Sequence, residues 1–189
     1  MATRTRTQVD RAALLRRSLL ELVAERGFRG TSMSAVAERA GVAAGTAYVH
    51  YDSKDELIVA TYVEIKLALG HAAVVGIPPD GSAHDRFVKV WYNIHDFLAA
   101  DPAQARYLAQ LEASPYFERA YRQLAEMDDP LLAAAAELKA VAIDLPVAVL
   151  WDLAVGPAIR LAADASTTLT ANQRTELAEA CWRALRKPD

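Results

Sequence analysis

Apolar residues recur at helical spacing through almost the whole chain, and this feature restricts the possible fold most strongly. In the first long segment, Ala12, Leu15, Leu19, Leu22 and Val23 fall on one face of a helix. Alanine and leucine dominate, and no stretch shows the clean alternation of β-branched and polar residues that is typical of a strand. The pattern therefore predicts an all-α protein.

Glycine and proline divide the chain into about nine predicted helices. Gly27 and Gly41 are suited to end helices, and a proline shortly after Asp or Ser is suited to begin one. Ser53 and Glu56 have the spacing of a capping box. We expect helices over about 10–26, 33–40, 44–50, 54–75 and 82–100, from Pro102, from Pro115 with a kink or restart at Pro130, and over 146–165 and 171–186.

Two of the predicted helices are short and lie close together in the sequence. Residues 33–40 and 44–50 are separated only by a tight turn at Gly41. Ala37 is small, so the second helix can cross closely over the first, and the helix over 10–26 supplies a back wall for both. This is the pattern of a helix-turn-helix, whose second helix enters the major groove of DNA.

Charge is distributed unevenly along the chain. The net charge is −3, which alone argues against a nucleic-acid partner. Residues 1–54 nevertheless carry nine lysines or arginines and five acids, a net charge of +4, whereas the remainder carries 12 basic and 19 acidic residues. This asymmetry indicates that the N-terminal end meets phosphate, although chance remains an alternative with numbers this small.

An ordered set of closely spaced residues surrounds the turn, over residues 27–57. They are Gly27-Phe28, Thr31-Ser32, Ala37, Ala40-Gly41-Val42, Gly45-Thr46, Tyr48, His50-Tyr51 and Ser53-Lys54-Asp55-Glu56-Leu57. In this set the segment resembles the TetR family of bacterial regulators. The C-terminal half carries Asp144-Leu145-Pro146, Gly156-Pro157 and Ala180-Cys181-Trp182-Arg183-Ala184-Leu185, a weaker resemblance to one version of that family's variable domain.

The resemblance implies which residues contact DNA. Donor groups on four side chains suit phosphate oxygens, and such contacts set the register rather than the sequence preference. Those four are Thr46, Tyr48, His50 and Lys54. Ser34 and Ala44 occupy positions that often face bases, and Gly45 lets the backbone approach the DNA closely.

The sequence departs from the family pattern at several positions. Ala43 and Ala44 stand where polar side chains are common, Ala35 replaces an acidic capping residue, and Tyr51 stands where Phe is more usual. Alanine cannot make a bidentate base contact, although it can touch a thymine methyl group. Sequence preference is therefore expected from Ser34, from DNA shape, or from a basic N-terminal arm (Arg4 and Arg6) in a minor groove.

Each of these DNA contacts has a structural alternative. Tyr48 could be a core aromatic, and His50 could complement the C-terminal end of its helix. Lys54 could be merely solvated, and the arm could be a tail without a role.

The second part of the chain carries most of the remaining aromatic residues, interleaved with a few polar ones. Helical cavities with this lining are typical small-molecule sites, and the resemblance implies such a pocket. The alternative is an ordinary bundle core. Candidate ligand contacts are Trp91, His95 and Tyr107, and the scarcity of basic residues on the apolar faces favours a neutral or apolar ligand.

Two late helices predict a homodimer interface. The helix over 146–165 is apolar almost all round, which requires burial on more than one side, and the last helix is amphipathic. The resemblance implies that these helices form a four-helix interface with a second copy. The candidate interface residues are Leu150, Trp151, Leu153, Leu177 and Trp182.

Other classes of protein find little support. The sequence has no phosphate loop, G-x-S-x-G or H-E-x-x-H motif, and its four histidines lack metal-ligand spacing, so we expect no enzyme, cofactor or metal site. With no long uncharged apolar run or signal sequence, we expect a cytoplasmic protein without a membrane partner. The lone Cys181 is expected to be a buried small hydrophobe.

The sequence thus predicts a DNA-binding domain over 1–53, with the arm, and a ligand-binding and dimerisation domain over 54–189. The expected function is a transcriptional regulator, most often a repressor in this family, that binds double-stranded operator DNA as a homodimer. A small-molecule effector is expected to release it. The alternative is a helical adaptor of the same fold that lacks sequence-specific DNA binding.

Overall fold

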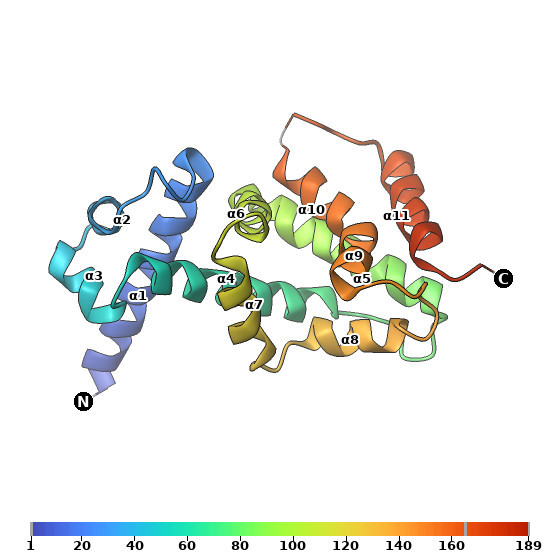
Figure 1. The fold of residues 1–189 in the computed structure, drawn as a ribbon, viewed down its shortest axis with the longest axis horizontal. Helices are drawn as coiled ribbons and strands as arrows, with labels where there is room; N and C mark the ends of the chain where they lie inside the picture. Colours follow the sequence, from blue (N-terminus) through green and yellow to red (C-terminus); the bar gives the residue numbers. More distant parts are fainter. Residues whose placement is uncertain (1, 165, 189) are drawn as a thin grey trace. The chain divides into compact units, whose positions relative to one another are not determined.

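The computed structural model describes residues 2–164 and 166–188, with side chains described from residue 11 on. Within this part the chain is helical, with no strand beyond an isolated bridge between Ala142 and Arg186, so the all-α prediction is confirmed (Figure 1). The helices are α1 (Ala2–Arg26), α2 (Met33–Arg39), α3 (Ala44–His50), α4 (Lys54–Ala73), α5 (Ala83–Ala100), α6 (Pro102–Glu112), α7 (Phe117–Ala125), α8 (Pro130–Leu138), α9 (Val147–Ala154), α10 (Gly156–Ala163) and α11 (Ala171–Leu185).

The described residues form eleven helices rather than about nine, because two predicted helices are each divided by a proline. Asp129 caps α8 through a hydrogen bond from the Leu131 amide, so the chain restarts at Pro130 instead of bending. Pro157 lies in the first turn of α10 and ends the long apolar helix predicted over 146–165. Proline lacks the amide hydrogen that a continuous helix needs at that position and collides with the preceding turn.

Several helix ends are set by capping side chains. Thr170 forms a full capping box with Gln173 at the start of α11. Ser53 accepts a hydrogen bond from the Glu56 amide, but the Glu56 carboxylate reaches the amide of Asp52 rather than that of Ser53. The first helix begins at Ala2, earlier than the predicted start near residue 10. None of the described helices combines the length and apolar character that crossing a membrane requires.

The chain divides into two compact units. One comprises the chain up to Ile65 together with Arg106–Met127, and the other comprises Lys66–Ala105 together with the chain from Asp128 on. The helices α4 and α6 each contribute residues to both units. The functional boundary expected between residues 53 and 54 stays a prediction, since this division describes packing rather than function.

The first unit is built around the buried face of α1. Leu15, Leu19 and Val23 are completely buried, as the helical spacing predicted. Phe28 follows this helix and packs edge-on against Tyr107, with ring centroids 5.5 Å apart. The segment 106–127 therefore belongs to the same core as the helix-turn-helix.

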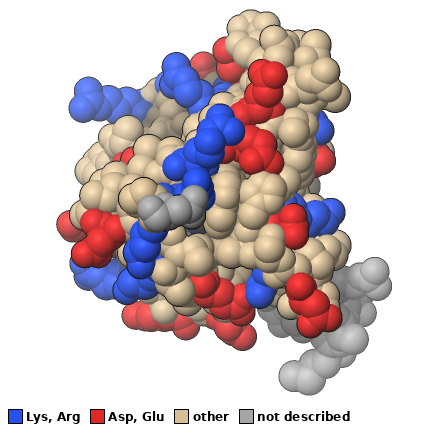
Figure 2. All heavy atoms as spheres, turned by 90° about the vertical axis from the view of Figure 1, so that its right-hand side faces the viewer, with Lys and Arg blue, Asp and Glu red and all other residues tan. Residues whose placement is uncertain are grey.

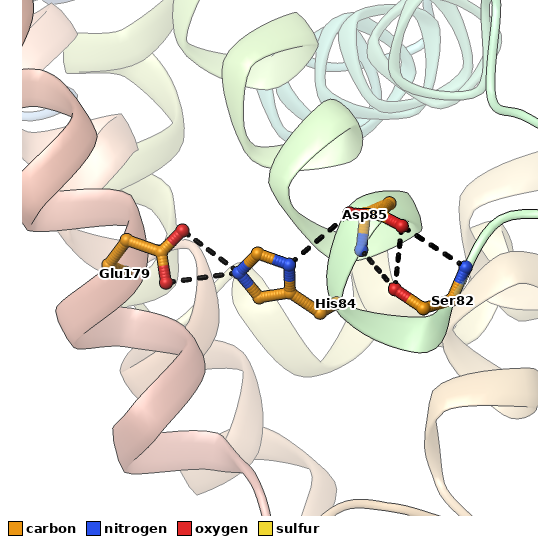
Figure 3. A network of polar contacts seen from close by, with 4 residues as sticks. All are labelled: Ser82, His84, Asp85 and Glu179. Atoms are coloured by element: carbon orange, nitrogen blue, oxygen red, sulfur yellow. Dashed lines mark hydrogen bonds and ion pairs between the residues drawn. The ribbon is translucent and has the colours of Figure 1, made fainter.

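The second unit is centred on α5, whose apolar side chains are buried against α10 and α11. Ser82 and Asp85 form a full capping box at its start. Figure 3 shows the His84 ring between Asp85 and Glu179, with Nε2 at 2.9 and 3.0 Å from the two carboxylate oxygens of Glu179 on α11. This hydrogen bond raises the pKa of His84, and the contact joins the first turn of α5 to α11.

Candidate nucleic-acid interface

The helix-turn-helix is held by short-range hydrogen bonds at its two turns. The Thr31 hydroxyl donates to the Gly27 carbonyl at 3.0 Å, and the Ser32 hydroxyl accepts from the Ala35 amide at 3.2 Å. Gly41 has a φ of +67°, which few residues other than glycine adopt without strain, and it turns the chain between α2 and α3. Ser32 thus caps α2, whereas Ala43 makes no side-chain cap hydrogen bond at the start of α3.

Arg39 fixes α2 against α1. Its two terminal nitrogens donate to the two carboxylate oxygens of Glu25 at 2.6 and 2.9 Å, which is the bidentate geometry that arginine favours. The same hydrogen bond holds the pKa of Glu25 below its usual value. The ion pair thereby fixes the position of α2, against which α3 packs.

The helix α3 has one buried side and one exposed side. Ala47 is completely buried, whereas Ala44, Gly45, Tyr48 and Val49 are exposed. Tyr48 is 55% exposed, so the alternative that it is a core aromatic is wrong. Tyr48 follows Ala44 by four positions, and Val49 follows Gly45 by four. The two pairs therefore lie side by side on one surface of the helix.

Gly45 is not required by packing within the chain. A Cβ atom added at this position would meet nothing within 4 Å. By contrast, a Cβ atom on Gly70 would lie 2.1 Å from a carboxylate oxygen of Asp129. The bare backbone at Gly45 is therefore free to face a large external partner.

Lys54 lies at the start of α4, and its ammonium group is engaged. It donates to the carbonyl oxygens of Phe28 and Thr31 at 3.0 and 2.9 Å. It is therefore not merely solvated, although an ammonium group has a third hydrogen to offer to a phosphate. Lys54 ties the loop between α1 and α2 to α4.

The remaining predicted DNA contacts are placed as follows. Ser34 is exposed, and its hydroxyl pairs with that of Ser32 at 2.9 Å. Thr46 and His50 are half-buried on α3, with His50 its last residue. The side chains of Arg4 and Arg6 lie outside the described residues.

Val49 is an exposed residue on this surface that the sequence reasoning missed. It is 74% exposed, the highest value among the exposed large hydrophobic residues of the described part. Projection of residues 44–50 on a helical wheel would have found it, because it follows Gly45 by four positions. A β-branched apolar side chain suits contact with a thymine methyl group.

The predicted ligand residues do not share one unit. Trp91 and His95 lie stacked in α5, with centroids 5.9 Å apart and planes inclined by 3°. Both are buried, and the Trp91 indole lies beside the thiol of Cys181 on α11, with which it interacts. Tyr107 belongs to the first unit, where its hydroxyl donates to the Ile58 carbonyl at 2.8 Å.

The predicted interface residues lie in the second unit. Leu150, Trp151 and Leu153 are half-buried in α9, which has no fully buried residue. Leu177 and Leu161 line a groove of about 580 Å³ between α10 and α11. Trp182 is half-buried, and its ring lies 5.4 Å from that of Phe87. Within this unit, therefore, α9 and the groove leave apolar surface partly uncovered.

Charged side chains do not gather by sign on the face drawn in Figure 2. Lysine and arginine lie among aspartate and glutamate, with uncharged surface between them. A mixed face of this kind does not produce the concentrated positive potential that attracts a nucleic acid. This face therefore does not compete with α3 as the candidate DNA contact.

Comparison with known proteins connects both parts of the chain to one family. Residues 15–61 match the family model described as bacterial regulatory proteins of the tetR family. Residues 83–186 match the model of a tetracyclin repressor-like C-terminal domain, which covers more than half of the chain. The chain belongs to the TetR family.

Full-length relatives agree with this assignment. An uncharacterized HTH-type transcriptional regulator of Haemophilus influenzae is 27% identical over 169 residues, covering 88% of this chain and 90% of that protein. The crystal structure of a TetR-family transcriptional regulator from H. influenzae superposes with a TM-score of 0.79, at 24% identity over 96% of this chain and 99% of the other. A TetR-family regulator from Marinobacter aquaeolei gives 0.77, at 19% identity over 100% of both chains. The TetR fold thus extends over nearly the whole chain.

Proposed function

We propose that this TetR-family protein regulates transcription by binding a palindromic operator as a homodimer through α3, and that a small molecule bound in its second unit releases it. One observation carries the DNA-binding half of the proposal. Ala47 anchors α3 in the core, while Ala44, Gly45, Tyr48 and Val49 are exposed on a surface that nothing in their own unit covers. A regulator of this kind acts in the cytoplasm, where bacterial DNA lies.

Each residue on this surface has a role that its chemistry supports. Tyr48 and Thr46 donate hydroxyl hydrogens to phosphates, His50 adds an imidazole donor at the end of α3, and Lys54 uses its third ammonium hydrogen. Gly45 lets the helix backbone approach the groove. Base recognition falls to Ser34 and to apolar contacts of Ala44 and Val49, together with DNA shape.

Dimerisation would be provided by α9 and α11. The predicted interface residues Leu150, Trp151, Leu153 and Leu177 are all only half-buried in a single chain. Burial of such surface against a second copy is favourable and places two copies of α3 in successive major grooves, about 34–36 Å apart. A two-fold dimer then matches a palindromic operator.

The effector would be neutral or apolar. Trp91 and the stacked ring of His95, both buried in α5, would contact it. An effector releases the operator only if it binds the DNA-free state more tightly than the DNA-bound state. Because α4 contributes residues to both units, it is the element through which the two states would be coupled.

In vitro selection tests the proposal. The purified chain is used to select duplexes from a random library, and the selected duplex is then titrated in a sedimentation experiment. We expect a palindrome that binds an even number of chains, with Tyr48→Ala as a folded control that binds the selected duplex about tenfold more weakly. An enriched sequence without two-fold symmetry would contradict the dimer, and a library without any enrichment would favour the adaptor alternative.

A further inference from the structure

A polar network joins three helices of the first unit behind the recognition helix. Tyr51 is the C-cap residue that directly follows α3, and it is 7% exposed. Arg16 of α1 donates from Nη1 to the Tyr51 hydroxyl at 2.5 Å, and its Nε forms an ion pair with the carboxylate of Glu64 on α4. One guanidinium group on α1 therefore contacts both the residue that follows α3 and a carboxylate on α4.

The network lies at the last turn of α4 within this unit. Glu64 is followed by Ile65, where the unit's share of α4 ends, and α4 continues to Ala73 as part of the second unit. A displacement of the later part of α4 would therefore reach the unit that contains α3 at the position of Glu64. Because Arg16 contacts both Glu64 and Tyr51, that displacement would also move Tyr51, the residue that follows α3.

Stability alone does not account for this arrangement. The side chain of Glu64 is 53% exposed and that of Arg16 is 21% exposed, and solvated ion pairs add little to folding. Phenylalanine would fill the space of the Tyr51 ring without offering an acceptor to Arg16. Burial raises the pKa of Tyr51, so the hydroxyl remains neutral and keeps its hydrogen. The planar guanidinium, fixed at one nitrogen, keeps its charge beside the Glu64 carboxylate on α4, as an ion pair without a hydrogen bond from Nε.

We propose that Arg16, Tyr51 and Glu64 form a positioning network that fixes the orientation of α3 relative to α4, and thereby sets operator affinity and the preferred half-site spacing. None of the three needs to touch DNA. The inference rests on the proposed function, because it assigns the network a role in binding an operator.

The test uses the full-length chain and the duplex that the wild type selects from a random library, together with duplexes whose half-sites are moved by one or two base pairs. Tyr51→Phe and Glu64→Gln are each expected to weaken binding roughly three- to tenfold and to flatten the spacing preference. The double variant is expected to be no weaker than the weaker single variant, because both changes break one network.

Glu64→Gln separates the proposal from simple electrostatics. Removal of a negative charge strengthens DNA binding through the long-range field, whereas loss of positioning weakens it. Arg16→Gln and Arg17→Gln make the same change of charge at adjacent positions of α1, and only the first is expected to alter the spacing preference. Thermal melting of every variant shows whether it is folded at the temperature of the titration.

Two results are distinguishable. If the wild type prefers its selected duplex and the variants bind it with unchanged affinity and spacing, at whatever melting temperature, the positioning network is refuted and the proposed function stands. If the wild type itself prefers no duplex over random DNA, the proposed function is refuted and the inference falls with it.

Discussion

Ala47 and Tyr48 are consecutive residues of α3 with opposite environments: Ala47 is completely buried and Tyr48 is 55% exposed. The first anchors the helix to its unit, and the second is available to a partner. Substitutions at the two positions should therefore separate folding from DNA binding.

Tyr48→Ala is expected to lower operator affinity by about tenfold, the effect of losing one phosphate or base contact of 1–2 kcal/mol, and to leave the melting temperature nearly unchanged. Ala47→Leu should destabilise the chain by about 1–3 kcal/mol, because the added atoms overfill a buried position. Thermal melting and fluorescence anisotropy on labelled operator check both expectations. Equal melting losses in the two variants would show that the Tyr48 side chain is part of the core.

Gly45→Ala tests whether the backbone of α3 approaches DNA. Since an added Cβ meets nothing within 4 Å, the variant should be at least as stable as the wild type. The higher helix propensity of alanine should raise its free energy of unfolding by up to about 1 kcal/mol. Its operator affinity should nevertheless fall, because the methyl group stands where the DNA is expected.

Gly70→Ala is the matched control for this glycine. Its Cβ would lie 2.1 Å from Asp129 Oδ1, so the same substitution should cost about 1–3 kcal/mol of stability. A Gly45→Ala variant that is stable and binds operator with wild-type affinity would remove Gly45 from the interface.

Lys54→Met should loosen the loop between α1 and α2. The ammonium group donates to two carbonyl oxygens there, and its loss from a half-buried position is expected to cost about 1 kcal/mol. Operator affinity should fall further than that cost explains, and the salt dependence of binding should become shallower by about one counterion. An unchanged salt slope would leave Lys54 with the structural role alone.

The contact between His84 and Glu179 should make stability depend on pH. The hydrogen bond from His84 to Glu179 raises the pKa of His84, so its contribution is fully present below the ordinary value of 6.5 and is lost as pH rises through the raised value. The melting temperature of the wild type should exceed that of His84→Gln by more near pH 5.5 than near pH 8.5. The side chain is 39% exposed, so the difference should be small. A gap that widens toward alkaline pH would contradict this assignment.

Much of the fold follows from the sequence because glycine, proline and capping residues act locally. The helices predicted over 82–100 and 171–186 begin where Ser82 and Thr170 cap them. Pro130 and Pro157 show the limit of this reasoning. Whether a proline kinks a helix or ends it depends on the packing around it, so two predicted helices became four.

The candidate site could be predicted in kind but not in every contact. The family resemblance pointed to Tyr48, and the structure leaves it exposed. The engagement of Lys54 with Phe28 and Thr31, and the contact of Arg16 with Tyr51, join residues 23 to 35 positions apart. No local pattern encodes such pairs, because they depend on how the helices are packed together.

The affinity of the chain for its selected duplex, measured against random DNA at two salt concentrations, tests the central claim most directly. If α3 reads DNA, the selected duplex should bind at least about a thousandfold more tightly than random DNA, and this ratio should persist at the higher salt concentration. Weak binding of both duplexes that disappears with salt would mean electrostatic attraction without sequence recognition, and would contradict the account.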